Sequence, residues 1–243
     1  MFVLFTDFTL HGPYVGQLKA ALHAHAPGVP VIDLMHDAPA LDPRSSAFLL
    51  EPICRSLPPG CVVIGVVDPG VGTTRPACVI EADGRWFVGP DNGLFEFVAR
   101  RGRDVRYRRL PPAGEDASPS FHGRDVFAPA AAAVLRGELP GDEAEAAERR
   151  YRVDWGDDTP QVLYVDGYGN AITGIRGDVV SDQAIVQAGE TELTRAETFG
   201  HMSRGAGFWY RNSSGLVEIA VNGGRADRIL GLEVGMMVRL LRP

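Results

Sequence analysis

The feature that most constrains the fold is a regular alternation of apolar runs and helical segments over the first 135 or so residues. Each apolar run is long enough for one strand, and between the runs apolar residues recur at helical spacing. The predicted strands are 1–8, 29–36 and 61–68, and the predicted helices are 12–27, 43–58 and 124–137. This order predicts an α/β layer with a largely parallel sheet.

Two further patterns predict β structure: a hairpin within the first 135 residues and a series of short strands after residue 160. Residues 77–89 are predicted to form a hairpin, because Asp83-Gly84 joins two β-rich runs. From Gln161 onward the strands are short and separated by Gly, Asn and Asp, which is typical of a small sandwich or barrel. The sequence therefore predicts an α/β N-terminal domain over 1–140, a polar linker over 141–160, and a smaller all-β, barrel-like C-terminal domain over 161–243.

Composition excludes several classes of protein. The formal net charge of −7 argues against a nucleic-acid binder, although it is compatible with a small cationic ligand. No apolar run reaches the roughly 18 residues needed to span a bilayer. The start of the chain lacks the basic lead-in of a signal peptide, so we expect a cytoplasmic protein with no membrane partner. Cys54, Cys61 and Cys78 each lie in an apolar run and are expected to be buried, reduced thiols.

Three acids stand where a parallel sheet would bind a ligand. Asp7 ends the first predicted strand, Asp68 ends the third, and Asp91 follows the hairpin. Ligands of open α/β sheets lie beyond the carboxyl ends of the strands. Three acids are more than capping requires, although Asp91 before Asn92-Gly93 also fits a turn.

The stretch "DPGVGTTR" after the third strand is glycine-rich but is not a phosphate loop. It has no lysine where a P-loop needs one, and Gly70 and Gly72 are too close together for G-x-G-x-x-G. The alternative is that the turn returns Arg75 towards Asp68. Because a guanidinium cannot lose its proton, Arg75 would keep Asp68 ionised.

Two further loops are open to more than one interpretation. His122 in "SFHGRDVF" is either an ordinary polar residue or a catalytic imidazole. The loop "VDGYGN", with Asp166, Tyr168 and Asn170, is either a hairpin turn or a site that stacks an aromatic ring on a base and offers an amide to its edge. The residues alone do not decide between these interpretations.

Seven stretches, taken together and in order, carry a family resemblance. They are "LFTDFTLHGPYVGQLKA", "VIDLMHD", "VVDPGVGTTR", "FVGPDNGLFE", "FHGRDVFAPAAA", "VDGYGNAITGI" and "NSSGLVEIAVNGGRAD". In these stretches the chain resembles the S-adenosylmethionine (SAM) hydroxide adenosyltransferases, the adenosine-forming SAM hydrolases related to fluorinases and chlorinases. The resemblance extends from Leu4 to about Leu232.

The resemblance implies SAM as substrate, no metal or other cofactor, and a homotrimer. In such a trimer the active sites lie between the N-terminal domain of one subunit and the C-terminal domain of its neighbour. The family's catalytic Asp-Arg-His set matches Asp68, Arg75 and His122. The implied substrate contacts are Asp7 for the ribose, Asp166 and Ser213 for the methionine portion, and, for adenine, Tyr168 by stacking, Asn170 by hydrogen bonding and the backbone near Asn222 and Gly223.

One departure from the family pattern concerns how the methionine portion of SAM is bound. Many members read T-D-F-G-x-x-D-P-Y after the first strand, whereas this chain reads "TDFTLHGPY", with Thr9 for the usual Gly and Gly12 for the usual Asp. A second carboxylate on the methionine ammonium is therefore expected to be missing. The ribose contact at Asp7 is not affected.

The expected reaction is in-line attack of water or hydroxide on the ribose C5′ of SAM. One alternative is halide transfer, but the fluorinases carry an additional loop after the region that matches "DPGVGTTR", and the tight hairpin here leaves no room for it. A second alternative is a non-catalytic SAM-binding sensor, which would have no use for a complete Asp-Arg-His set. A third is a metal hydrolase using Asp7, His36, Asp68 and Asp91, none of which has a ligand spacing such as H-E-x-x-H.

Overall fold

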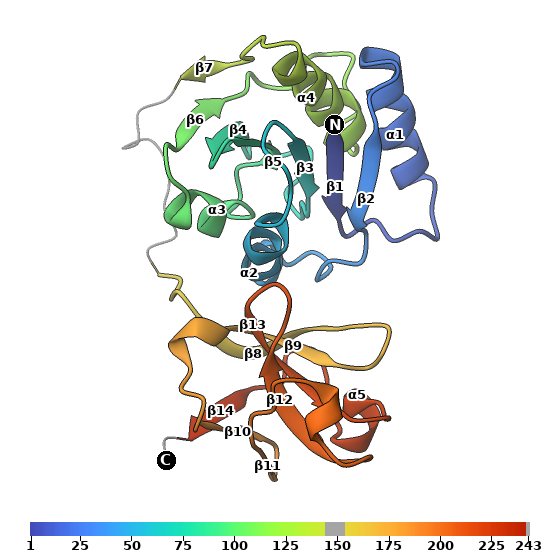
Figure 1. Ribbon diagram of the computed structural model, residues 1–243. Helices are drawn as coiled ribbons and strands as arrows, with labels where there is room; N and C mark the ends of the chain where they lie inside the picture. The colour runs from blue at the N-terminus through green and yellow to red at the C-terminus, as the bar shows by residue number, and fades with distance from the viewer. Residues whose placement is uncertain (144–153, 242–243) are drawn as a thin grey trace. The chain divides into compact units, whose positions relative to one another are not determined.

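The computed structural model describes residues 1–143 and 154–241, which belong to two compact units that divide between Asp154 and Trp155 (Figure 1). Residues 144–153 of the predicted linker lie outside the described residues. The domain boundaries at 140 and 161 therefore stay a prediction.

The first unit is built on a seven-stranded sheet of order β2-β1-β3-β5-β4-β6-β7. Its strands are β1 (Phe2–Thr6), β2 (Val31–Met35), β3 (Val62–Val66), β4 (Ala77–Ala82), β5 (Arg85–Pro90), β6 (Arg106–Arg109) and β7 (Asp142–Glu143). The neighbours β2, β1, β3 and β5 run parallel, whereas β4 is antiparallel to both β5 and β6, and β7 is antiparallel to β6. The predicted α/β layer with a mostly parallel sheet is confirmed.

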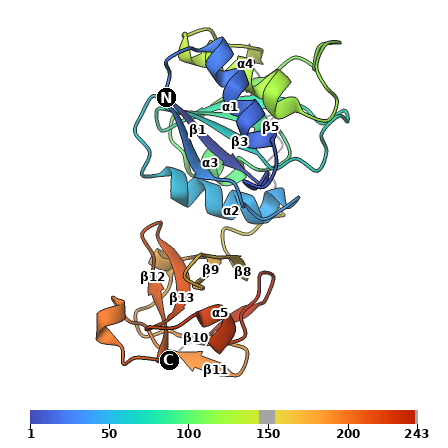
Figure 2. The ribbon, with the colours of Figure 1, turned by 90° about the vertical axis from the view of Figure 1, so that its right-hand side faces the viewer.

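Helices cover both faces of this sheet. They are α1 (Tyr14–His25), α2 (Pro43–Cys54), α3 (Glu96–Arg101), the π-helix η1 (Gly123–Phe127) and α4 (Ala128–Leu135). Figure 2 shows α1 and α4 on one face and α2 on the other, where Phe48 of α2 stacks on Phe97 of α3 with 4.2 Å between ring centroids. The sequence does not predict the short α3, because six residues are too few to show a helical period. No helix in the described part of the chain is long and apolar enough to cross a bilayer.

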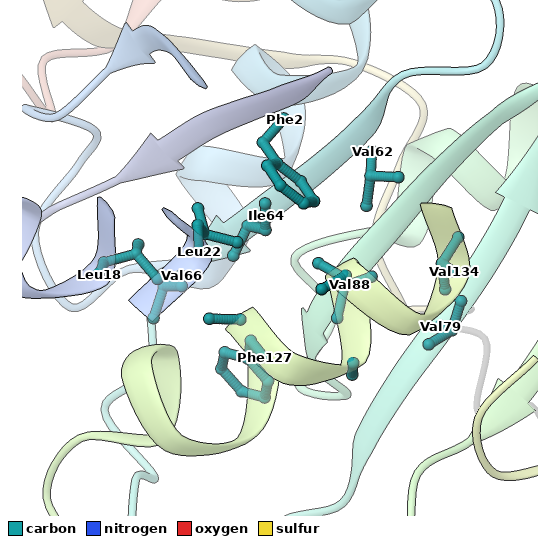
Figure 3. Packing of buried hydrophobic residues seen from close by; sticks show 14 of the residues in the cluster. Phe2, Leu18, Leu22, Val62, Ile64, Val66, Val79, Val88, Phe127 and Val134 are labelled. Atoms are coloured by element: carbon teal, nitrogen blue, oxygen red, sulfur yellow. The ribbon is translucent and has the colours of Figure 1, made fainter. Parts of the chain in front are cut away.

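The main core of the first unit lies between the sheet and the pair α1 and α4. Ile64 of β3 and Val88 of β5 are fully buried there, against Leu22 of α1 and Phe127 at the end of η1 (Figure 3). Fully burying such a side chain stabilises the fold by about 1.5–3 kcal/mol. The apolar residues at helical spacing in α1 and the continuous apolar run of β3 are therefore two sides of one core.

The predicted hairpin and the predicted thiols are confirmed. Ala82 of β4 pairs with Arg85 of β5, and Asp83 and Gly84 between them have φ angles of 51° and 71°. Positive φ at both central residues is the type I′ geometry that matches the twist of paired strands. The cysteines are buried and form no disulfide.

The second unit is a small antiparallel β domain of two sheets, β12-β13-β9-β8 and β11-β10-β14. Its elements are β8 (Thr159–Val165), β9 (Ala171–Arg176), β10 (Ile185–Ala188), β11 (Thr191–Leu193), β12 (Gly207–Arg211), β13 (Leu216–Val221), α5 (Ala226–Ile229), β14 (Val238–Leu241) and the 3-10 turns Gly177–Val179 and Phe199–His201. Single bridges, Gln161 to Met237 and Arg195 to Trp209, join strands or strand ends outside the regular ladders. The barrel-like prediction agrees with this arrangement around the fully buried Trp209.

Two isoleucines of the first sheet, one buried and one exposed, test how much the core contributes to the free energy of unfolding. We expect Ile64→Ala to lower the free energy of unfolding by about 2–5 kcal/mol, because Ile64 is 0% exposed and its loss leaves a cavity. The control Ile32→Ala, at a side chain that is 43% exposed on edge strand β2, should cost about 0.5 kcal/mol or less. Urea unfolding of both variants measures the difference, and equal losses would contradict this assignment of the core.

Candidate active site

The turn after β3 brings Arg75 back onto Asp68. The backbone N–H of Gly70 donates to Asp68 Oδ1 (3.3 Å), and the N–H of Thr73 donates to the carbonyl of Gly70 (3.2 Å), so the chain reverses within a few residues. Arg75 then donates from Nε to Asp68 Oδ1 (2.9 Å) and from Nη2 to Oδ2 (2.5 Å). This is the bidentate geometry of a strong carboxylate–guanidinium pair.

The pair is buried and is extended by an imidazole. The side chains of Asp68 and Arg75 are 3% and 9% exposed. Arg75 Nη2 lies 3.3 Å from His122 Nδ1. Because a guanidinium only donates hydrogen bonds, Nδ1 accepts, and the proton of the neutral ring lies on Nε2. Burial, and then the charge of Arg75, lowers the pKa of His122 below its ordinary 6.5, against weaker opposite effects of Asp68 and Asp125.

His122 is positioned by the π-helix η1, which replaces the first turn of the helix predicted over 124–137. His122 immediately precedes η1. The carboxylate of Asp125 accepts a hydrogen bond from the N–H of Ser118 (2.9 Å), which ties the preceding loop to η1. Single π turns are frequent at functional sites.

Gly72 and Gly70 play different parts in the turn. Gly72 has φ +76°, and a Cβ placed on it would lie 2.3 Å from the carbonyl oxygen of Pro119. The glycine is therefore needed both for its left-handed backbone and for the close approach of the loop before His122. At Gly70 a Cβ would meet Thr73 Oγ1 at an ordinary 3.5 Å.

A cavity of about 530 Å³, here called the substrate cavity, opens at the carboxyl ends of β1 and β3. Asp7, Asp68 and His122 all line it. The volume is that of a small-molecule site, and the position is where open parallel sheets bind ligands.

Aromatic side chains form part of the wall of the substrate cavity. Phe8, Tyr14 and Phe121 all line it, and their ring centroids are 5.5–5.9 Å apart. These rings offer an apolar and polarisable surface beside the acids. Such a surface suits a cationic organic ligand.

Asp7 is held by a backbone group that the sequence does not indicate. The N–H of Leu41 donates to Asp7 Oδ2 (2.9 Å). Burial raises the pKa of Asp7, and the hydrogen bond from Leu41 opposes that shift. Leu41 and Thr9 both have φ 56°, in the left-handed region that favours glycine. Because Leu41 acts through its N–H, its residue type gives no signal of this contact.

His36 and Asp91 have structural partners. His36 is buried, with Nδ1 2.8 Å from Thr6 Oγ1 and Nε2 3.1 Å from Asp33 Oδ1. Asp91 accepts a hydrogen bond from the hydroxyl of Tyr107 (2.8 Å). Among residues 1–143 and 154–241, no three His, Cys, Asp or Glu side chains are grouped to hold a metal ion.

In the second unit, Asp166, Tyr168 and Asn170 share the loop between β8 and β9. Asp166 Oδ1 accepts hydrogen bonds from the N–H groups of Tyr168 and Asn170, both at 2.9 Å. Tyr168 is 81% exposed, whereas Asn170 is buried, with Nδ2 3.4 Å from Asp166 Oδ2. The loop is tied to the residues before α5, because Arg225 donates to the carbonyl of Gly167 (3.0 Å).

The remaining predicted substrate contacts lie at the two ends of β13. Asn222 and Gly223 follow the strand, on the side of α5, and Asn222 Nδ2 donates to the carbonyl of Met202 (2.6 Å). Ser213 is exposed and precedes β13, in the turn from β12. Within this unit the structure thus does not bring Ser213 to the end of β13 that carries Asn222.

At the position of the missing carboxylate the structure has an exposed glycine. A Cβ on Gly12 would lie 3.3 Å from the ring of Tyr14. Gly12 therefore stands close to the aromatic wall of the substrate cavity.

Comparison with known proteins gives a consistent result over both units. Residues 2–144 match the family model for the SAM hydroxide adenosyltransferase N-terminal domain, and residues 160–239 match that for the C-terminal domain. A (R)-S-adenosyl-L-methionine hydrolase of Thermus thermophilus is 42% identical over 253 residues, covering 97% of each chain. One of Salinispora tropica is 34% identical over 249 residues, covering 97% of this chain and 95% of that one.

Two solved structures resemble this one. An uncharacterized conserved protein of Thermotoga maritima superposes with a TM-score of 0.85 at 31% identity, over 100% of both chains. A conserved hypothetical protein of Thermus thermophilus superposes with a TM-score of 0.76 at 40% identity, over 99% of both chains.

The two glycines of the turn give a matched test of the site. We expect Gly72→Ala to lower the free energy of unfolding by more than about 1 kcal/mol, because it combines a strained backbone with the clash at Pro119. Gly70→Ala should change it by about 0.5 kcal/mol or less, since no close contact results. Thermal unfolding of the two variants measures the difference, and an equal effect would contradict the role assigned to Gly72 in the turn.

Proposed function

The chain belongs to the SAM hydroxide adenosyltransferase family, and we propose that it hydrolyses SAM to adenosine and L-methionine. The observation that carries this proposal is the buried Asp68–Arg75 pair with neutral His122, on the wall of a cavity that Asp7 also lines. The relatives that carry the hydrolase name align with nearly the whole chain, which supports the same activity here.

The leaving group of this reaction departs without catalytic help. SAM carries a sulfonium, so attack at the ribose C5′ expels neutral methionine without the help of an acid. The protein must hold the ribose still and place a water in line with the C5′–S bond. Positioning of this kind can supply roughly 7–11 kcal/mol of the barrier. No metal or cofactor is needed for such a displacement.

The Asp-Arg-His set supplies the groups that hold this water. His122 donates from Nε2, because its Nδ1 is occupied by Arg75. His122 therefore orients the water and is not the base in this arrangement. As the C5′–O bond forms, the attacking oxygen becomes strongly acidic, so the carboxylate of Asp68 suffices to accept its proton.

The remaining contacts follow the family assignment. Asp7 accepts hydrogen bonds from the ribose hydroxyls, and its carboxylate is already oriented by Leu41. Asp166 and Ser213 contact the methionine portion. Adenine is held by Tyr168, by Asn170 and by the backbone at Asn222 and Gly223.

The assembly that fits this assignment is a cytoplasmic homotrimer, in which the second unit of a neighbouring copy completes each substrate cavity. Leu41 and Tyr14, which line that cavity, are 68% and 49% exposed, and Leu10 close by in the chain is 74% exposed. Tyr168 of the second unit is also an exposed aromatic side chain. Apolar surface of this kind is typical of a surface that a partner covers.

Incubation with SAM in ¹⁸O-labelled water tests the reaction and the bond that is cleaved. We expect labelled adenosine and free, unlabelled methionine, because the water oxygen becomes the 5′-hydroxyl. Added chloride or fluoride should leave adenosine as the product. A halogenated nucleoside would favour halide transfer, and tight binding without turnover would favour a sensor.

The pH dependence tests the role of His122. We expect kcat to fall as pH falls through the pKa of His122, below the ordinary 6.5, because a protonated Nδ1 would face the Arg75 guanidinium. His122→Asn should lose that acid limb and lower kcat by about 10²-fold, because the water is no longer positioned. Asp68→Ala and Arg75→Ala, with SAM binding measured separately by calorimetry, complete the series. Turnover that survives in these variants with binding intact would reject the assignment.

A further inference from the structure

A second cavity of about 560 Å³ lies behind the Asp-Arg-His set, here called the rear cavity. Arg75 lines the rear cavity, Asp68 lines the substrate cavity, and His122 lines both. The buried ion pair and the imidazole therefore form the wall between the two spaces. The rear cavity takes no part in the contacts assigned to SAM above.

The walls of the rear cavity come from two segments that meet at Gly72. One is the turn from Gly72 to Ala77, and the other is the loop from Leu110 to Pro119. In the described part of the chain no carboxylate lines this cavity, whereas Arg75, Arg109 and His122 do. Its volume far exceeds the ~30 Å³ that one water molecule occupies in the liquid. A space of this size with polar groups on one wall has room and partners for several waters.

The reaction itself requires a route for water that the substrate does not block. An in-line displacement at C5′ needs the nucleophile on the side opposite to sulfur. Each turnover also consumes one water. None of the residues assigned to the ribose, methionine or adenine of SAM lines the rear cavity, whereas Arg75 and His122 do.

We propose that the rear cavity is the solvent chamber of the enzyme: it supplies the attacking water past His122, which lines both cavities. This inference rests on the proposed function. The water oxygen bonds to C5′ as the C5′–S bond breaks, and that bond's electron pair stays on the sulfur of methionine. One proton of the water remains on the 5′-hydroxyl. The other passes to Asp68, which lines the substrate cavity and releases the proton to water there once the products leave.

His122 is suited to pass water between the two spaces. Its Nδ1 accepts from Arg75, so its Nε2–H is the ring donor that can hold a water. The residue precedes η1 and lines both cavities.

Filling the rear cavity tests the proposal. Ala117 lines it, whereas Glu115, in the same loop, is exposed and does not. We expect Ala117→Trp to lower kcat by about 10²-fold, as when a reacting group is displaced, with unchanged affinity for a non-hydrolysable SAM analogue. The control Glu115→Trp and the small variant Ala117→Ser should turn over like the wild type.

The possible outcomes separate this inference from the proposed function. A wild type that forms no adenosine from SAM rejects both. An active wild type with an equally active Ala117→Trp, or with equal losses in Ala117→Trp and Glu115→Trp, rejects the solvent chamber alone. Loss of analogue binding in Ala117→Trp also rejects it, because Ala117 would then act on substrate binding. If Ala117→Trp unfolds, Ala113→Trp at another position of the same wall takes its place.

Discussion

The buried ion pair between Asp68 and Arg75 is the interaction on which the site depends. Taking two charges out of water costs several kcal/mol for each, and only close, well-aligned contacts offset that cost. Here the contacts are bidentate, at 2.9 and 2.5 Å, and the turn after β3 holds both partners. The pair also sets the state of His122, because the same guanidinium occupies Nδ1. One fixed charge thus orients a carboxylate and selects a tautomer.

The parallel sheet brings the carboxyl ends of β1 and β3, and the acids that follow them, to one edge. Asp7 follows β1 and Asp68 comes shortly after β3, and these strands are parallel neighbours with Phe2 opposite Val62. Their carboxyl ends therefore meet at one edge, where the charge of Asp68 helps to raise the pKa of Asp7. Arg75 neutralises the charge of Asp68, so the two carboxylates can lie close together without strong mutual repulsion. The cavity that they line can therefore accept a cation.

The sequence predicts those parts of the molecule that residue type and spacing encode. Apolar periodicity reveals the strands and the long helices, and Asp83-Gly84 reveals the hairpin because its turn needs positive φ. The return of Arg75 to Asp68 is also readable from the glycine-rich turn. The backbone donor at Leu41 and the π turn at η1 are not, because each depends on tertiary packing that overrides the local pattern. Only the family resemblance identifies His122 as a catalytic residue from the sequence.

The left-handed backbone at Thr9 and Leu41 lowers the stability of the fold in exchange for an ordered loop beside Asp7. Each non-glycine residue in that region costs about 1–3 kcal/mol, a sizeable share of the 5–15 kcal/mol that holds a domain folded. The folded protein carries this cost, and the N–H of the strained Leu41 holds the Asp7 carboxylate in place. Glycine at either place would remove this strain, but it would also give the unfolded chain more conformational freedom to lose. It would also shift the entropic cost of ordering this loop onto every binding event.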